Sequence, residues 1–207
     1  MASKGNRTTT YSLDWDVVVN LELRLLRDFR ANPNLDTTID LFMVSIGSRL
    51  GLRVMDLLSL KFVDLKHLEV GERFIVVEKK TMKERVLIMG SRLREVLDLV
   101  FLTCQIREED YIFTSRKGKG KSPMSQQHFN RRLRAIMERH KIRFVGNCSS
   151  HLLRKSWVVA TIKRGFEQGD HLALIKVSRL IGHSNVSTTL KYTNFELSQS
   201  YDLFELS

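Results

Sequence analysis

Residues 74–89 read FIVVEKKTMKERVLIM, and this stretch contains the clearest β element of the chain. Two runs rich in apolar residues, Phe74–Val77 and Arg85–Met89, flank the polar segment Glu78–Glu84. Short apolar runs on either side of a polar turn are typical of a β-hairpin. The polar segment carries three lysines, so we expect the hairpin tip to be basic and to project from the molecule.

Helices are expected on both sides of the hairpin. Apolar residues at helical spacing predict one helix from Ser12 to about Ala31 and another from Thr37 to about Gly51. Further helices are predicted at residues 53–60, 92–101, 126–140, 151–163 and 172–181, with one or two short ones after residue 187. The expected fold class is therefore mainly α with a small antiparallel β-hairpin.

Length and composition fit a single domain. A chain of 207 residues that is 43% hydrophobic can bury a substantial core. We expect residues 1–36 to form an N-terminal helical extension and residues 195–207 to form a C-terminal helix. No stretch approaches the roughly 18 uninterrupted apolar residues of a membrane span, and the N-terminus has no apolar secretion signal. Cys104 and Cys148 are too few for a disulfide scaffold, which favours a reducing cytoplasm.

The net charge of +11 is concentrated in one segment. Residues 114–143 contain ten basic residues and one acid, a net charge of +9, whereas residues 195–207 carry a net charge of −3. A basic stripe favours a polyanion, because each neutralised phosphate releases a condensed counterion. The alternative is a merely solvated surface. The candidate DNA-binding residues are Arg116, Lys117, Lys119 and Lys121 in a flexible loop, and Arg131, Arg132 and Arg134 on a predicted helix.

The sequence offers no nucleotide-binding or metal-binding motif. The loop Arg116–Lys121 lacks the G-x-x-x-x-G-K-[ST] order of a phosphate-binding P-loop. His140, Cys148 and His151 lie near one another in sequence, but a fourth zinc ligand is missing. We therefore expect neither a metal nor a cofactor.

Polar residues with catalytic potential occur at two places in the predicted helices. His151 and Arg154 are three residues apart, so both lie on one face of a helix near its N-terminus and could reach one anion. Later a helix stops at Gly182, His183 follows, and Tyr192 comes nine residues after that. Taken singly, a histidine or a tyrosine is more often a packing residue than a catalytic one.

Taken together, the motifs resemble those of the tyrosine recombinases, or phage integrase family. The resemblance covers about residues 37–195 and occurs in the order of that family at Gly51–Leu60, Lys79–Arg85, His151–Arg154, Ile181–Ser184 and Tyr192. It implies the tyrosine recombinase catalytic-domain fold. Departures are Leu50 where threonine is usual, Asp56 where glutamate is usual, and no proline near Met89.

The resemblance also implies roles for individual residues. Tyr192 is the implied nucleophile that attacks a scissile phosphodiester. Arg53 and Arg154 are the implied clamp on its non-bridging oxygens, where planar guanidinium groups stabilise the charge of the transition state. His151 is the implied general base for the tyrosine hydroxyl, whose ordinary pKa of about 10 makes it a poor nucleophile. His183 is implied to donate a hydrogen bond to the phosphate.

The implied general acid for the departing 5′ oxygen is Lys80. Lys79 and Lys83 remain alternatives, because a mobile hairpin could present any of the three. Asp56 is expected to support the site by orienting the guanidinium of Arg53, one helical turn away. A covalent phosphotyrosine conserves the energy of the broken bond, so the implied reaction needs no cofactor.

The implied function is that of a site-specific DNA recombinase that cleaves and rejoins DNA through a 3′-phosphotyrosyl intermediate, in integration, excision or inversion. The alternative is a non-catalytic DNA-binding or architectural regulator with the same fold. The expected partners are double-stranded DNA and further copies of the chain in a tetrameric synapse, with no membrane. The C-terminal helix is expected to cap its own protomer in the isolated chain and to dock in trans in the synapse.

The N-terminal part of the sequence is short for this family. The 52 residues before Arg53 leave no room for a separate N-terminal core-binding domain. The chain is thus expected to be either a naturally minimal recombinase or a catalytic fragment.

Overall fold

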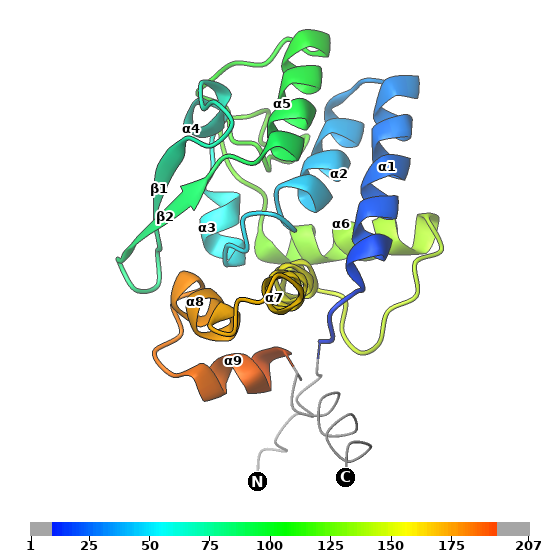
Figure 1. Cartoon of the computed structure of the whole chain (residues 1–207). Coiled ribbons are helices and arrows are strands. Elements are labelled where there is room, and N and C mark those ends of the chain that lie inside the picture. Colours follow the sequence, from blue (N-terminus) through cyan, green and yellow to red (C-terminus); the bar gives the residue numbers. More distant parts are fainter. Residues whose placement is uncertain (1–9, 194–207) are drawn as a thin grey trace, which may run out of the picture.

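The structure is a computed structural model, and it describes residues 10–193 of the chain. The predicted C-terminal helix at residues 195–207 lies outside these residues, as do the first nine residues of the predicted N-terminal extension. Within the described part, helices surround one antiparallel hairpin (Figure 1). The prediction of a mainly α fold with a small antiparallel sheet is confirmed.

The elements follow one another along the chain as the apolar spacing predicts, with small shifts at their ends. The helices are α1 (Trp15–Ala31), α2 (Leu35–Ser45), α3 (Val54–Leu58), α4 (Val63–Lys66), α5 (Ser91–Thr103), α6 (Gln126–Arg139), α7 (Ser150–Glu167), α8 (Ala173–Leu180) and α9 (Val186–Thr193), and the strands are β1 (Arg73–Val77) and β2 (Glu84–Ile88). Helix α4 was not predicted, because four residues are too few to show a helical period.

Helix α2 forms the centre of the larger part of the molecule. Its start is fixed by Asn34, whose side-chain oxygen accepts hydrogen bonds from the backbone N–H groups of Asp36 (2.8 Å) and Thr37 (3.1 Å), while Thr37 Oγ1 accepts one from Asn34 N. This reciprocal pair is a capping box. All residues from Thr38 to Ser45 are buried, since α1, α5 and α6 pack around the helix (Figure 1).

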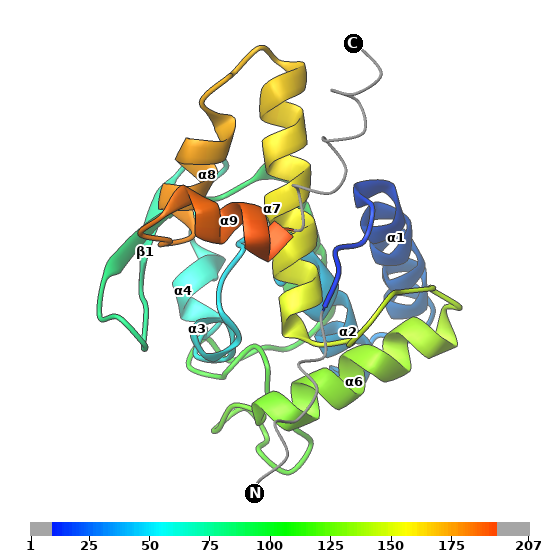
Figure 2. The same cartoon turned by 90° about the horizontal axis from the view of Figure 1, so that it is seen from below.

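The long helix α7 connects two apolar clusters. Its first half joins the large core around α2 through Leu152 and Leu153. Its second half carries Val158 and Ile162, which pack with Val177 of α8 in a second, smaller cluster. Seen from below, α7 runs between α1 on one side and α8 and α9 on the other (Figure 2). The residues of α7 between Leu153 and Val158 therefore lie at the boundary between the two clusters.

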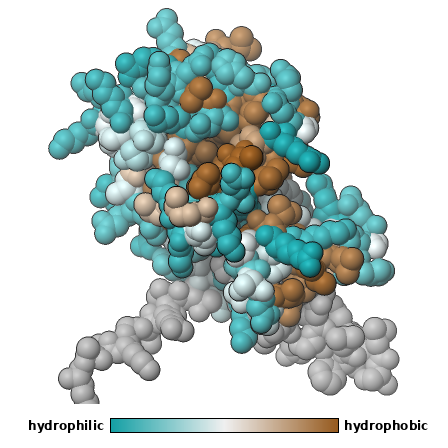
Figure 3. Space-filling view, turned by 90° about the vertical axis from the view of Figure 1, so that its left-hand side faces the viewer, coloured by the Kyte–Doolittle hydropathy of each residue, from teal (hydrophilic) through white to brown (hydrophobic). Residues whose placement is uncertain are grey.

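The hairpin is amphipathic, with one face on the core and the other exposed. In the antiparallel register Ile75 lies opposite Val86, and alternate residues are buried in both strands. The exposed face carries apolar side chains, which Figure 3 shows gathered on this side of the molecule; they are Ile75, Val77, Val86 and Ile88. The inward face holds Phe74, Val76 and Leu87 but also one arginine, Arg85. A charged side chain in that position must be held by specific partners.

Candidate active site

Two buried arginines share one backbone carbonyl between the hairpin and α7. Arg154 donates from Nη1 to the carbonyl oxygen of Gly51 (2.6 Å) and from Nη2 to that of Ile181 (2.9 Å). Arg85 donates from Nη1 to the same Gly51 oxygen (2.9 Å) and from Nη2 to that of Leu50 (3.1 Å). These side chains are 3% and 5% exposed. Backbone carbonyls thus hold both guanidinium groups without neutralising their charge.

Gly51 is required at the point where the arginines meet. Its φ angle is +54°, in the left-handed region that favours glycine. A Cβ added there would lie 2.6 Å from Cε3 of Trp157, so the indole ring packs directly on the glycine. The ring and the backbone conformation together fix the direction of the Gly51 carbonyl.

Arg53 completes the group and pairs with a hairpin acid. It lies at the N-cap of α3, and its side chain is 24% exposed. Its Nη1 forms an ion pair with Oε2 of Glu78, the residue that follows β1. A Cβ at Gly182 would lie 3.8 Å from Arg53 Nη2, so the loop after α8 also lies against this pair. Arg53 is therefore the more accessible arginine of the three.

The site carries an excess of buried positive charge. Burial, and then the charge of Arg154, lower the pKa of Arg85 to about 10, so it stays protonated at neutral pH. Burial alone would raise the pKa of Glu78, but hydrogen bonds from Thr81 and Arg53 lower it, and the carboxyl is ionised. Such a group of cations, partly exposed at Arg53, favours an anion.

Asp56 does not orient Arg53, which corrects the expectation from the sequence. The carboxylate of Asp56 is buried, and its Oδ1 accepts a hydrogen bond from the backbone N–H of Lys79 at 2.8 Å. The acid that pairs with Arg53 is Glu78. The short helix α3 directs Asp56 toward the hairpin, so Asp56 supports the turn instead.

Lys80 lies in the turn of the hairpin and is exposed. Lys79 and Lys83 are exposed on the same turn, so exposure does not distinguish Lys80 from its neighbours. The backbone of Lys79 is tied to Asp56, whereas the Lys80 side chain extends from the middle of the turn. The choice of Lys80 over its neighbours stays a prediction.

The two candidate histidines flank the arginines from different elements. His151 is the second residue of α7 and is exposed at its rim. The surrounding protein atoms, and then the charges of Arg154, Lys155 and Arg53, lower the pKa of its imidazole. His183 follows Gly182, and its pKa is lowered by burial and then by Arg154 and Arg53. Both imidazoles are therefore neutral at neutral pH and able to accept a proton.

His183 is oriented by a chain of hydroxyl groups. Its Nδ1 lies 2.9 Å from Oγ1 of Thr189, and that hydroxyl donates to Oγ of Ser178 at 2.9 Å. Ser178 and Thr189 are both buried, on α8 and α9. Since the Thr189 hydroxyl donates its proton to Ser178, its oxygen accepts a hydrogen bond from His183 Nδ1–H. In the neutral ring Nε2 then carries no proton and can accept one.

Tyr192 lies on α9, which packs against α7 and α8 (Figure 2). Its side chain lies outside the part of the chain that the structure describes. The backbone places it on the element that follows His183 and carries Thr189. Its role as nucleophile stays a prediction.

Sequence reasoning missed Glu78 and Arg85, although a signal for both existed. In β1 the buried residues Phe74 and Val76 alternate with exposed ones, and Glu78 continues the same phase. In β2 Arg85 has the phase of buried Leu87. Since side chains alternate between the faces of a strand, a polar residue in the inward phase points to a buried polar site.

The predicted DNA-binding residues differ in their surroundings. Lys117, Lys119 and Lys121 are exposed in the loop before α6, and Arg131 and Arg134 are exposed on that helix. Arg132 is instead engaged in ion pairs with the two acids of α2, from Nη1 to Asp36 (3.0 Å) and from Nε to Asp40. Arg116 also pairs with Asp36, and Arg139 with Asp40 (2.6 Å). Within the described residues, Arg132 thus fastens α6 to α2.

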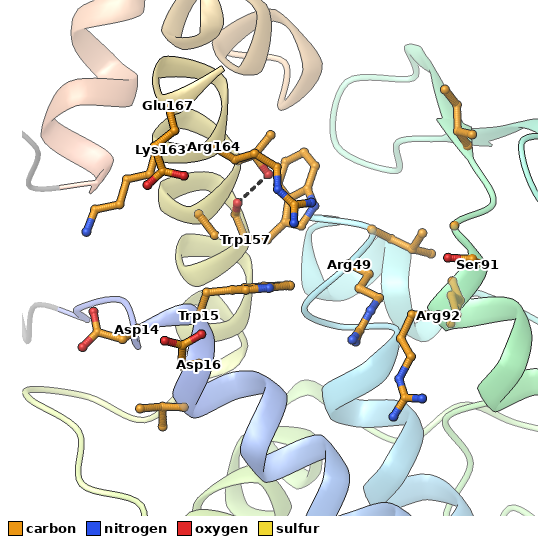
Figure 4. Close-up of a pocket in the computed structure, with 17 residues that line it drawn as sticks. Asp14, Trp15, Asp16, Arg49, Ser91, Arg92, Trp157, Lys163, Arg164 and Glu167 are labelled. Carbon is orange, nitrogen blue, oxygen red and sulfur yellow. Dashed lines mark hydrogen bonds between the residues drawn. The ribbon is translucent and has the colours of Figure 1, made fainter. Parts of the chain in front are cut away.

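A separate hollow of about 770 Å³ is lined by Leu50 and by Trp157, the residue that packs on Gly51. Figure 4 shows Trp15 and Trp157 on one side of it and Arg49 and Arg92 opposite. Both of these arginines bond to the buried Oε2 of Glu22, at 2.6 and 3.2 Å. None of the candidate catalytic residues lines this hollow, so its size alone does not make it the active site.

Residues 10–193 contain no group of three or more histidines, cysteines or acids that could hold a metal ion. No helix among them is both long enough and apolar enough to span a membrane.

Comparisons with known proteins agree with the motifs. The model of the phage integrase family matches residues 21–198. The tyrosine recombinase XerD of Listeria monocytogenes is 29% identical over 172 residues, which cover 80% of this chain and 53% of that protein. XerC of Pseudomonas fluorescens is 29% identical over 209 residues, covering 96% of this chain and 62% of that protein.

Solved structures show the same fold. The crystal structure of XerA recombinase has a TM-score of 0.64 at 22% identity, over 93% of this chain and 64% of that one. XerH recombinase bound to a palindromic difH substrate also has a TM-score of 0.64, at 20% identity, over 99% of this chain and 56% of that one. The chain spans about half the length of the XerD relative. Because the family match at residues 21–198 includes every candidate catalytic position, the chain belongs to the phage integrase family.

Proposed function

We propose that this chain is the catalytic part of a site-specific DNA recombinase that cleaves and rejoins DNA through a 3′-phosphotyrosyl intermediate. The observation that carries the proposal is the pair of guanidinium groups of Arg85 and Arg154 on the Gly51 carbonyl, with the ion-paired Arg53 and two neutral histidines beside them. A cluster of guanidinium groups suits a phosphodiester whose charge increases in the transition state.

The proposed cleavage step gives a role to each of the six candidate catalytic residues. The Tyr192 oxygen attacks phosphorus while its proton passes to the neutral imidazole of His151. Arg53 and Arg154 stabilise the non-bridging oxygens. His183 donates a hydrogen bond to them from Nε2 as the imidazolium, a form that the charge of the bound phosphate favours, because the Nδ1–H of the ring is already bound to Thr189. Lys80 gives a proton to the 5′ oxygen as the P–O bond breaks. The products are a 3′-phosphotyrosyl bond and a 5′-hydroxyl, and attack by a new 5′-hydroxyl reverses the step.

The basic surface is the proposed grip on the duplex. We propose that Arg116, Lys117, Lys119 and Lys121 contact the DNA backbone from the loop before α6, and that Arg131 and Arg134 do so from α6. Arg132 belongs to the same basic segment, but its three ion-pair and hydrogen-bond contacts with Asp36 and Asp40 suggest a supporting role there. Because such contacts release counterions, we expect affinity for DNA to fall steeply with salt.

Assembly is proposed from the relatives rather than from this chain. A lambda integrase tetramer bound to a Holliday junction is among the structures with the same fold. We propose that residues 1–207 form one catalytic domain, that the chain is a monomer or weak oligomer when free, and that it forms a tetrameric synapse on DNA. We also propose that residues 195–207 dock in trans in that synapse, and that the protein acts on DNA in the cytoplasm. Deletion of residues 196–207 without any loss of synapse formation would exclude trans docking.

The test is covalent trapping on a suicide substrate. Nicked duplexes made from the DNA that flanks the coding sequence are incubated with the protein, and SDS-resistant protein–DNA adducts are counted. We expect an adduct with the wild type and none with Tyr192→Phe. Tyr11→Phe, at an exposed tyrosine far from the site in sequence, is the matched control and should retain the adduct.

Each result of the trapping experiment has a definite meaning. An adduct with Tyr192→Phe would disprove the nucleophile assignment. DNA binding by the wild type without an adduct on any flanking sequence would favour the alternative, a non-catalytic DNA-binding regulator.

A further inference from the structure

Glu78 is a buried acid with no role in the proposed reaction. It is 3% exposed and stands between the last residue of β1 and the turn that carries Lys80. Its backbone closes that turn, because Glu78 N donates to the carbonyl of Lys83 (3.0 Å) and the Glu78 carbonyl accepts from Met82 N (2.8 Å). The residue is thus part of the framework on which Lys80 is presented.

The Glu78 side chain connects this turn to Arg53. Oε2 forms the ion pair with Arg53 Nη1 and accepts a hydrogen bond from the Thr81 hydroxyl at 2.8 Å. One carboxylate oxygen therefore touches both the arginine assigned to the phosphate and the residue that follows Lys80. The charge of Arg53 also favours the ionised form of the carboxyl.

A second acid holds the turn on the other side of Lys80. Asp56, three residues after Arg53, accepts the backbone N–H of Lys79 at 2.8 Å. The residues immediately before and after Lys80 are thus each bound to a buried carboxylate beside Arg53. Together the two acids set where the turn lies relative to the arginines.

Burial of these two carboxylates destabilises the fold, so a contribution to stability does not explain why the acids are there. Glu78 Oε1 and Asp56 Oδ2 are buried and accept no hydrogen bond within the described residues. An unsatisfied buried oxygen destabilises a fold, because no hydrogen bond compensates for its loss of water. Such groups in a native protein call for an explanation, and a functional one is available here.

We propose that Glu78 is a positioning residue that fixes the distance between the phosphate clamp at Arg53 and the general acid Lys80. This inference rests on the proposed function and adds a residue to it. The Nη1 atom of Arg53 is buried where it pairs with Glu78, whereas the side chain as a whole is 24% exposed. The hydrogen bond from Thr81 makes the turn follow the arginine, and Lys80 then lies beside the leaving oxygen of a phosphate bound there.

The experiment separates proton donation from phosphate binding by changing the leaving group. Suicide duplexes carry either the normal 5′ oxygen or a 5′ sulfur at the scissile bond. An alcohol with a pKa near that of water, about 15.7, needs a proton to leave, whereas a thiol with a pKa of about 8.5 leaves as a thiolate without one. Single-turnover adduct formation is measured on both for the wild type, Lys80→Ala, Thr81→Val and Glu78→Gln.

The expected results differ between the variants. Lys80→Ala should be slow on oxygen DNA and near the wild-type rate on sulfur DNA. Thr81→Val, which removes only the link to the turn, should be slowed about 10-fold on oxygen DNA, part of the roughly 10²- to 10⁴-fold of general acid catalysis, and should be rescued by sulfur. Glu78→Gln should lose about 100-fold on oxygen DNA and be rescued only partly, because Arg53 is also displaced.

Controls separate positioning from folding. Glu84→Gln removes an exposed acid from the same hairpin and should leave both rates unchanged. Thr81 is exposed, so its variant keeps the question answerable even where Glu78→Gln folds poorly by thermal unfolding. Wild-type rates for Thr81→Val and Glu78→Gln on oxygen DNA, or equal slowing on both substrates, would overturn the inference while leaving the proposed function intact. Absence of a wild-type adduct on both substrates would instead reject the proposed function and the inference with it.

Discussion

Two clusters of arginines in residues 10–193 are held in opposite ways. The α2–α6 ion-pair cluster consists of two acids and three arginines, Asp36, Asp40, Arg116, Arg132 and Arg139, joined carboxylate to guanidinium. Its arginines are accessible to different degrees, with side chains 83%, 17% and 51% exposed for Arg116, Arg132 and Arg139. Here the charges are largely matched by nearby acids, and salt weakens exposed pairs of this kind.

The Gly51 arginine cluster consists of Arg53, Arg85 and Arg154. Two of these arginines are bound to backbone carbonyls, which satisfy N–H groups but bring no negative charge. Glu78 pairs with Arg53, and the charges of Glu78 and Asp56 both act on Arg85, so three arginines and two acids leave this cluster net positive, as in the α2–α6 cluster. The two clusters therefore differ in the groups that contact the guanidinium groups and not in their net charge. The difference teaches that a run of arginines in a sequence does not identify the anion site. The distinguishing feature is whether acids or carbonyls hold the guanidinium groups.

The largest expected effect separates the clusters by chemistry. Arg154→Ala should slow adduct formation by about 10²- to 10³-fold or more, because loss of one preorganised donor to a developing oxyanion costs that much. Arg132→Ala should leave the single-turnover rate of bound DNA close to that of the wild type, since its contacts are with α2. Rates are measured at saturating protein on the suicide duplex. Equal losses in the two variants would remove the distinction between the clusters.

The next effect is on stability. Arg85→Met keeps the size of the side chain but leaves the Leu50 carbonyl without this donor, and we expect a loss of about 1–3 kcal/mol in the free energy of unfolding. Arg132→Met should cost less, about 1 kcal/mol, because Arg116 and Arg139 still contact the two acids. Urea unfolding of both variants gives the comparison. A larger loss for Arg132→Met would show that the ion-pair cluster is the more important to the fold.

The sequence predicted much of the fold because the apolar period is strong in the long helices and alternation is clear in the hairpin. The pattern of buried Leu21, Leu25 and Phe29 is enough to place α1. The candidate site was predicted less completely, since motif spacing identifies which residues matter but not what each one touches. Asp56 and Glu78 illustrate this: both are near Arg53 in space, and only three-dimensional packing decides that the ion pair goes to the acid 25 positions away in the chain.

The sequence also does not predict which arginine of the basic run at residues 131–134 joins the α2–α6 ion-pair cluster. Arg132 and Arg134 look alike in sequence, within one basic run. The first is turned toward Asp36 and Asp40 by the phase of α6, and the second is exposed. A helix turns about 100° per residue, so two residues along it is enough to change the surroundings entirely.

The smallest expected effect concerns the pH range over which the titrating groups of each cluster change the free energy of unfolding. Folding lowers the pKa of His151 and His183, first through burial and then through Arg154. The unfolded chain therefore binds protons near pH 6.5 that the folded chain does not, and the free energy of unfolding should fall as pH decreases below about 6.5. Folding also lowers the pKa of Asp36, chiefly through the hydrogen bond from Arg116. Its contribution to stability is present above the ordinary aspartate pKa of 3.8 and is lost as pH falls below that value.

Unfolding measurements from pH 8 to pH 3 can separate the two ranges. His183→Asn should flatten the dependence between about pH 6.5 and 5 without changing the acidic part, whereas Asp36→Asn should flatten only the part below about pH 4. His128 and His140 also have lowered pKa values, so His128→Asn is the control for a histidine outside the Gly51 arginine cluster. If His128→Asn alone removed the dependence near pH 6, the lowered pKa of His183 would not be a source of the pH dependence of stability.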